Sequence, residues 1–154
     1  MTFELLESMI ELSKINIDRF QRISMDRVSQ LRFSMTSFDT GRQTGKSTAI
    51  SRYTKENDNV IVVSPSKVLT KIMTERLQSV NKFNLSVADF NNSHNSNIFR
   101  GLCGEFDLIF DECSLDDILF CLSSLGIHSG IKIRSIVKVG LMYDYEKLCK
   151  EAHE

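Results

Sequence analysis

Apolar residues near the start of the chain recur at helical spacing. Over residues 3–31 they fall three to five positions apart, beginning with Leu5, Met9 and Leu12. This period is typical of an amphipathic helix, in which every third or fourth side chain lies on one face. The stretch Asn-Ile-Asp at residues 16–18 interrupts the pattern. We therefore expect a helical segment that is broken at that point.

After residue 32 the period shortens, and short apolar runs alternate with helical patterns. The run Val-Ile-Val-Val at residues 60–63 is β-branched, as in strands buried in parallel sheets, and residues 83–90 predict a strand at the sheet edge. The expected strands are residues 33–38, 60–63, 83–90, 106–110 and 133–139, and the expected helices are 46–57, 66–80, 115–125 and 144–153. Strands that alternate with helices predict a three-layer α/β fold with a mostly parallel central sheet.

Composition favours one domain without a dominant charge. A length of 154 residues with 42% hydrophobic content suits a single core, so we expect one domain over residues 1–154. It consists of a helical preface, residues 1–32, and a core, residues 33–154. The 19 basic and 20 acidic side chains give a net charge of -1, so any binding to nucleic acid requires a local patch.

The chain carries no signal for secretion or for membrane insertion. Glu4 and Glu7 stand where a signal peptide needs positive charge, and no apolar run is long enough to span a bilayer. The four cysteines are scattered without a C-x-x-C pair, which favours reduced thiols over a metal site or a disulfide framework. We expect a cytoplasmic protein with no membrane partner.

The stretch DTGRQTGKSTAI predicts a phosphate-binding loop. Gly45, Lys46 and Ser47 match the end of the pattern Gly, four residues, Gly-Lys-Ser/Thr, although Thr40 stands where the first glycine belongs and Gly41 follows it. A glycine turn lets backbone N–H groups approach phosphate oxygens, and a helix N-terminus favours anions. In this interpretation Lys46 reaches the outer phosphates and the Ser47 hydroxyl binds Mg²⁺. The alternative is an ordinary first-turn lysine.

A second motif supplies two adjacent carboxylates. The apolar run at residues 106–110 leads into Asp111 and Glu112. A parallel strand delivers Asp111 to the carboxyl edge of the sheet, where ligands bind in open α/β folds and where an aspartate can hold Mg²⁺ through water. Glu112 is then placed to polarise an attacking water. The alternative is that both acids cap the helix that follows Ser114.

Together these motifs resemble the ATPase domain of large terminase subunits, the DNA-packaging motors of tailed bacteriophages, and more loosely that of helicases. Terminases often carry the loop as small residue, Arg, Gln, any residue, Gly-Lys-Ser/Thr, which fits the displaced Gly41. The resemblance implies a RecA-like P-loop NTPase that uses ATP and Mg²⁺, with Arg42 stabilising charge on the outer phosphates. A solvent-exposed arginine is the alternative for Arg42. The implied nucleotide-binding loop residues are Gly41, Arg42, Gln43, Thr44, Gly45, Lys46, Ser47 and Thr48.

Two further elements match the family less closely. Gln21, after Phe20, lies about as far ahead of the loop as the aromatic-Gln element that reads adenine in the family, so the resemblance implies that Gln21 binds the base. A helical face with Phe20 in the core explains the same residues. Residues 137–140 stand where the family has its coupling strand, but the expected Thr or Ser is absent.

Functionally, the resemblance implies Mg²⁺-dependent ATP hydrolysis in which Glu112, Arg42 and Lys46 are catalytic. The residues after Tyr143 are too few for a nuclease domain or a second RecA-like domain, so we expect the ATPase module alone. It would act as a stand-alone ATPase, as a homo-oligomer, or with a protein or nucleic-acid partner. One alternative is a nucleotide-dependent switch or interaction protein with little turnover. A small nucleotide kinase is a further alternative, although residues 113–131 contain no arginine for a lid.

Arginines in the helical preface are a candidate surface for nucleic-acid phosphates. The acidic residues Asp18 and Asp26 lie among them at ion-pairing spacing, which favours an ordinary solvated helix. The arginines are Arg19, Arg22, Arg27 and Arg32.

Overall fold

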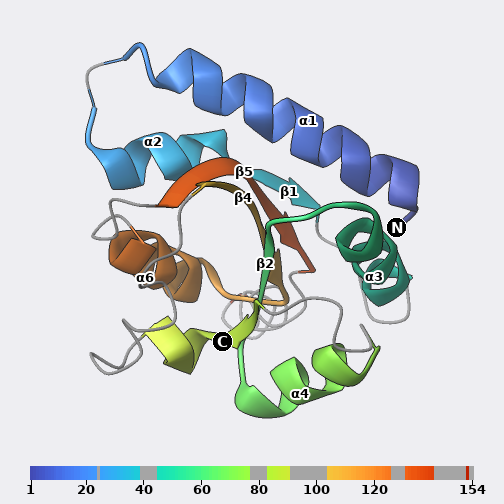
Figure 1. Ribbon diagram of the computed structural model, residues 1–154. Helices are drawn as coiled ribbons and strands as arrows, with labels where there is room; N and C mark the ends of the chain where they lie inside the picture. Colours follow the sequence, from blue (N-terminus) through green and yellow to red (C-terminus); the bar gives the residue numbers. More distant parts are fainter. Residues whose placement is uncertain are drawn as a thin grey trace.

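A parallel sheet forms the centre of the molecule. The computed structural model describes residues 1–23, 25–38, 45–76, 83–90, 104–125, 131–140 and 152. The strands are β1 (Thr36–Phe38), β2 (Val60–Ser64), β3 (Asn84–Ser86), β4 (Gly104–Asp111) and β5 (Ile131–Val139). They lie in the order β1-β5-β4-β2-β3, and every pair is parallel (Figure 1). The helices are α1 (Phe3–Phe20), α2 (Arg27–Ser34), α3 (Lys46–Glu56), α4 (Lys67–Arg76) and α6 (Leu115–Leu125), with a 3-10 turn η1 (Val87–Phe90).

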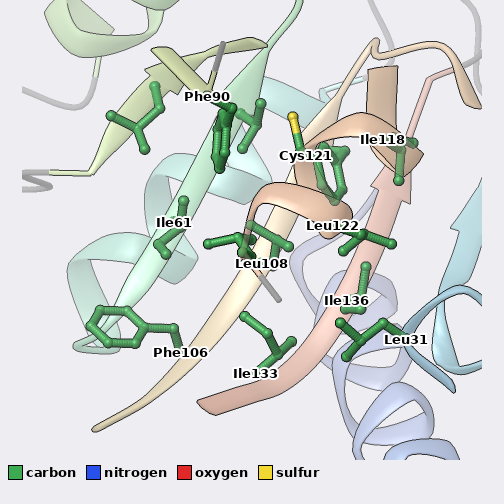
Figure 2. Packing of buried hydrophobic residues seen from close by; sticks show 14 of the residues in the cluster. Leu31, Ile61, Phe90, Phe106, Leu108, Ile118, Cys121, Leu122, Ile133 and Ile136 are labelled. Atoms are coloured by element: carbon green, nitrogen blue, oxygen red, sulfur yellow. The ribbon is translucent and has the colours of Figure 1, made fainter. Parts of the chain in front are cut away.

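Helices cover both faces of this sheet. Along β2, Val60 and Val62 join the core cluster that includes residues of α1 and α3, whereas Ile61 and Val63 join the cluster that includes residues of α2 and α6. Figure 2 shows the second cluster, in which side chains of the strands meet those of α6 and α2. The alternation follows from the pleat of a strand, whose successive side chains point to opposite faces. The predicted three-layer α/β fold is thus observed.

The predicted break in the first helix is wrong. Helix α1 runs without interruption from Phe3 to Phe20, because Ile17 is buried and Ser13 holds the helix to its neighbours. The Ser13 hydroxyl donates to the Ser34 carbonyl at 2.8 Å and accepts from the backbone N–H of Ile136 at 2.7 Å. The chain leaves the helix only after Gln21. These buried contacts outweigh the weak local propensity of residues 16–18.

The first two residues of the strand predicted for 33–38 belong to a helix. Asp26 caps α2 by accepting hydrogen bonds from the Ser29 N–H at 2.9 Å and the Ser29 hydroxyl at 2.7 Å, and the helix continues to Ser34. Phe33 lies on α2 with 57% exposure, and its ring packs against that of Phe20 at a centroid separation of 6.1 Å. Strand β1 covers only Thr36–Phe38. The helix that Asp26 caps therefore extends into residues whose alternation of apolar and polar side chains predicted a strand.

The remaining expectations agree with the structure in outline. The edge strand at residues 83–90 is present as β3 but ends early, because the Asp89 carboxylate accepts from the Ser86 N–H at 2.7 Å and turns the chain into η1. The strands and helices predicted at 46–57, 60–63, 106–110, 115–125 and 133–139 are observed, with ends shifted by a few residues. The predicted helix at 144–153 falls outside the described residues, apart from residue 152.

Membrane insertion and cysteine state can be checked for part of the chain. Within the residues the structure describes, no helix is long and apolar enough to cross a membrane. Cys113 and Cys121 are free thiols and are buried. Burial raises the pKa of Cys121 to about 12 and raises that of Cys113 as well, so both thiols stay protonated at neutral pH. The thiols are therefore packing groups and not nucleophiles.

A buried carboxylate that the sequence pattern does not reveal holds β4 to β5 and α3. Asp107 is fully buried and accepts hydrogen bonds from the Tyr53 hydroxyl at 2.6 Å, the Ser135 hydroxyl at 2.6 Å and two nitrogens of Arg134 at 2.7 and 2.9 Å. Burial alone raises the pKa of Asp107, but the hydrogen bonds from Arg134, Ser135 and Tyr53 overcome it and lower the pKa below its usual value. A register shift opposite Phe106 and Asp107 leaves Arg134 as the extra residue of β5.

Candidate functional site

Three parallel strands end in one row at the carboxyl edge of the sheet. Phe38 at the end of β1 pairs with Val139 of β5, which in turn pairs with Asp111 at the end of β4. Because neighbouring strands lie roughly 4.8 Å apart, the ends of β1 and β4 are about 10 Å apart. The end of β1 and the residues Asp111 and Glu112 are therefore at the same edge, separated by the end of β5.

The helix that follows β1 begins with a glycine at this edge. Gly45 is the N-cap of α3 and has a left-handed backbone, with φ 78°. A β-carbon at Gly45 would lie 3.3 Å from the backbone oxygen of Met1, so the position is tight as well as left-handed. The N–H groups of the first helical turn have no partner within the helix, and they attract anions. Lys46 and Ser47 lie in that turn, with Lys46 buried and Ser47 half-buried.

Lys46 and Glu112 form an ion pair across this edge. The Lys46 Nζ contacts the Glu112 Oε1, which joins the start of α3 to the residue directly after β4. The Lys46 side chain is 9% exposed and that of Glu112 is 31% exposed, so the pair lies in a recess that solvent reaches from the glutamate side. The structure thus brings together two residues that are 66 positions apart and that the two sequence motifs singled out separately.

The backbone around Glu112 has an uncommon conformation. Glu112 has φ 58°, in the left-handed region that residues other than glycine seldom adopt, and its N–H donates to the Val139 carbonyl at 2.8 Å. This hydrogen bond ties the turn after β4 to the end of β5. Residues held in this region cost of order 1 kcal/mol and cluster at functional sites, so the geometry marks Glu112 as a position under constraint.

Gly140 provides the space in which the ion pair forms. It follows β5, has φ 80° and donates its N–H to the Phe38 carbonyl at 2.9 Å. A β-carbon at Gly140 would lie 2.8 Å from the Lys46 Nζ and 3.1 Å from the Glu112 Cγ. In the sequence, Gly140 stood out only because a Thr or Ser was missing from residues 137–140. A glycine directly after an apolar strand was the available signal for a close approach at this point.

Asp111, the last residue of β4, and Glu112, which follows it, are not the N-cap of α6. Ser114 has that role, because its hydroxyl accepts from the Asp117 N–H at 3.2 Å and its carbonyl accepts from the Ile118 N–H at 3.0 Å. Asp111 is 8% exposed and closes β4, one residue before Glu112. The N-cap residue of α6 is therefore Ser114.

The oxygen atoms at this edge suit Mg²⁺. The Ser47 hydroxyl and the Asp111 carboxylate are hard oxygen ligands, and Mg²⁺ in phosphate-transfer sites is typically held by one or two such side chains together with waters and substrate phosphates. The residues present fit a Mg²⁺–polyphosphate ligand in chemical type.

Some of the remaining predicted residues lie outside the described part of the chain, and the others lie away from the Lys46–Glu112 pair or on the surface. Gly41, Arg42, Gln43 and Thr44 lie outside the described residues, and Thr48 is exposed in the first turn of α3. The structure does not bring Gln21 to the site. The start of α1 lies beside Gly45, because the Met1 backbone oxygen is there, whereas Gln21 caps the other end of this 18-residue helix, about 27 Å away at 1.5 Å per residue.

Comparison of the sequence with protein-family models and with curated proteins finds no match.

Proposed function

We propose that this chain binds ATP with Mg²⁺ at the carboxyl edge of its sheet and hydrolyses it, as a RecA-like P-loop NTPase. The observation that carries the proposal is the pairing of Lys46 with Glu112. A lysine at the N-terminus of the helix after one strand meets the acid after another strand, with a single strand between them. This arrangement joins the two groups that phosphoryl transfer needs, a cation for the phosphates and a carboxylate for the water.

Binding rests on the start of α3. The backbone N–H groups of its first turn and the helix dipole favour the phosphate chain, and Lys46 contributes a full positive charge in a recess with little solvent. Ser47 and Asp111 would hold Mg²⁺, which neutralises charge that builds up on the phosphate oxygens when it is bound. Gly45 keeps the entrance of the helix free of a side chain.

In the hydrolytic step Glu112 orients the attacking water and accepts its proton. The water oxygen forms a bond to the outer phosphorus, the bond from that phosphorus to the bridging oxygen breaks, and ADP and inorganic phosphate result. Proton transfer by a positioned carboxylate contributes about 100- to 10,000-fold to rate. The half-exposed position of Glu112 suits this role, because water reaches the recess from its side.

Arg42 and the nucleic-acid or protein partner come from the resemblance to terminases and helicases. Arg42 remains the predicted stabiliser of charge on the outer phosphate. Asp26 caps α2, and the arginines of the helical preface are exposed. Stimulation of turnover by single- or double-stranded DNA would identify nucleic acid as the partner.

The decisive experiment compares two lysines of α3. Lys46→Ala should abolish ATP binding, since it removes the buried charge, whereas the control Lys55→Ala changes an exposed lysine in the last turn and should bind as the parent does. Isothermal titration with ATP and Mg²⁺ gives affinity, and release of phosphate gives turnover. Equal ATP affinity in Lys46→Ala and the parent would refute the proposal.

A further inference from the structure

Lys46 already has an anionic partner inside the protein. The Glu112 carboxylate contacts the ammonium group that the proposed function assigns to the outer phosphates. The N–H of Nζ that points to Glu112 cannot also bond to a phosphate oxygen, and the Lys46 side chain is only 9% exposed. Glu112 thus occupies, from within the protein, the place at Lys46 that a phosphate of the ligand would take.

The backbone holds Glu112 in this place. Its left-handed conformation and the hydrogen bond from its N–H to the Val139 carbonyl fix the turn after β4, and the missing side chain of Gly140 leaves the gap through which the carboxylate reaches Lys46. The contact is therefore built by the ends of two strands and does not depend on a chance rotamer of a long exposed side chain. Such a partly buried pair is weakened much less by solvent than a surface pair.

We propose that Glu112 occupies the anion site of the nucleotide-free protein, and that a polyphosphate must displace it from Lys46. The inference rests on the proposed function and adds a regulatory step to it. Displacement exchanges one anion for another at Nζ and frees the Glu112 carboxylate, which then turns to the water. Phosphate binding and release of the general base are in this way one event, so the carboxylate stays on Lys46, and does not act on the attacking water, until a nucleotide is present.

The test measures anion affinity when the internal ligand is neutral. The probes are inorganic tripolyphosphate without Mg²⁺, and ADP with Mg²⁺, titrated into the parent and into Glu112→Gln. Removing the competing charge should tighten binding of tripolyphosphate by about fivefold, and Lys46→Ala should remove the binding in both backgrounds. The matched control is Glu105→Gln, which neutralises an exposed acid paired with Lys132 at the other end of β4 and should leave the affinity unchanged.

The outcomes separate the two proposals. Equal or weaker tripolyphosphate binding in both Glu112→Gln and Glu112→Ala overturns the displacement, even when ATP is still bound and hydrolysed by the parent. Absence of binding by the parent and by Glu112→Gln for every probe overturns the proposed function itself. Glu112→Ala serves as the second variant, and it should tighten binding in the same direction if the amide of Gln still bonds to Lys46.

Discussion

Strand β4 carries acidic side chains in two places, and their surroundings differ. Asp107, in the middle of the strand, is sealed from solvent and receives hydrogen bonds from Tyr53, Arg134 and Ser135. Glu112, directly after the strand, is 31% exposed and pairs with Lys46 of α3. A carboxylate that receives several bonds from the fold has little left to offer a ligand. A carboxylate with one ionic partner and access to water can exchange that partner.

The difference also lies in the direction of the strand. Parallel strands point all of their carboxyl ends to one edge, and loops that bind ligands gather there. Asp107 lies in the middle of β4, away from that edge, and bonds to side chains of the fold. We therefore expect the two acids of one strand to differ in role, Asp107 for stability and Glu112 for the proposed chemistry. Three substitutions and one change of pH test this difference.

Asp107→Ala should have the largest effect on stability. It leaves the Arg134 guanidinium without its carboxylate and strands two hydroxyl groups, which we expect to cost about 3–5 kcal/mol of unfolding free energy. Urea denaturation measures it. The control Glu105→Ala breaks a pair whose members are each more than half exposed and should cost less than about 1 kcal/mol. A loss below about 1 kcal/mol for Asp107→Ala would remove the contrast.

Glu112→Gln should lower the turnover of ATP strongly and change stability little, the reverse of what we expect for Asp107→Ala. Turnover of ATP should fall by about 100-fold or more, because the amide cannot accept the proton, while the unfolding free energy changes by less than about 1 kcal/mol. Steady-state phosphate release and urea denaturation report the two quantities, with Glu105→Gln as the matched acid. Turnover within about threefold of the parent would show that Glu112 is not the general base.

Gly140→Ala should loosen the site by steric means. The new β-carbon would lie 2.8 Å from the Lys46 Nζ, so the ammonium must move, and we expect about a tenfold loss of ATP affinity. Gly104→Ala is the control, since that glycine also has a positive φ, at 122°, but the nearest atom to its β-carbon is 3.8 Å away. Both variants should lose about 1 kcal/mol of stability from backbone strain. If both lose affinity equally, the space at Gly140 has no special role.

Acid titration should give the smallest effect. The pKa of Asp107 is lower in the folded protein than in the unfolded chain, so its contribution to stability is present above the unfolded value, about 3.9, and is lost as pH falls through the folded value. The stability gap between the parent and Asp107→Asn should therefore shrink below about pH 4. Urea midpoints between neutral and acidic pH measure the gap. A gap that grows on acidification would mean that the hydrogen bonds do not favour the charged carboxylate.

Local signals made part of this molecule predictable. The helix that begins at Lys46, the β-branched run of β2 and the apolar run that ends in Asp111 each depend on a few consecutive residues, and the structure confirms all three. Their meeting at one edge followed from the rule that parallel strands share a direction. The predicted α/β fold needed no long-range information.

Other features depend on residues that are distant in the chain. The partners of Asp107 lie 54, 27 and 28 positions away, so nothing near it indicated a buried carboxylate. Helix α1 continues through residues 16–18 because Ser13 bonds across 123 positions to β5. Gln21 matched the spacing of a family motif, but spacing in sequence did not fix its distance from Gly45, because α1 carries it away.

The register shift in β5 decides which face of the sheet each side chain in the second half of the strand points to. Before Arg134, Ile131 and Ile133 face one layer, and after it Ile136 faces the same layer, while Val137 and Val139 face the other. One extra residue thus exchanges odd for even positions along the second half of the strand. If β5 kept Arg134 but paired regularly with β4, Lys138 would stand opposite Asp111 in place of Val139, and Gly140 would be out of step with Lys46. The irregularity at Asp107 thus decides which side chains of β5 stand at the edge where Lys46 and Glu112 meet.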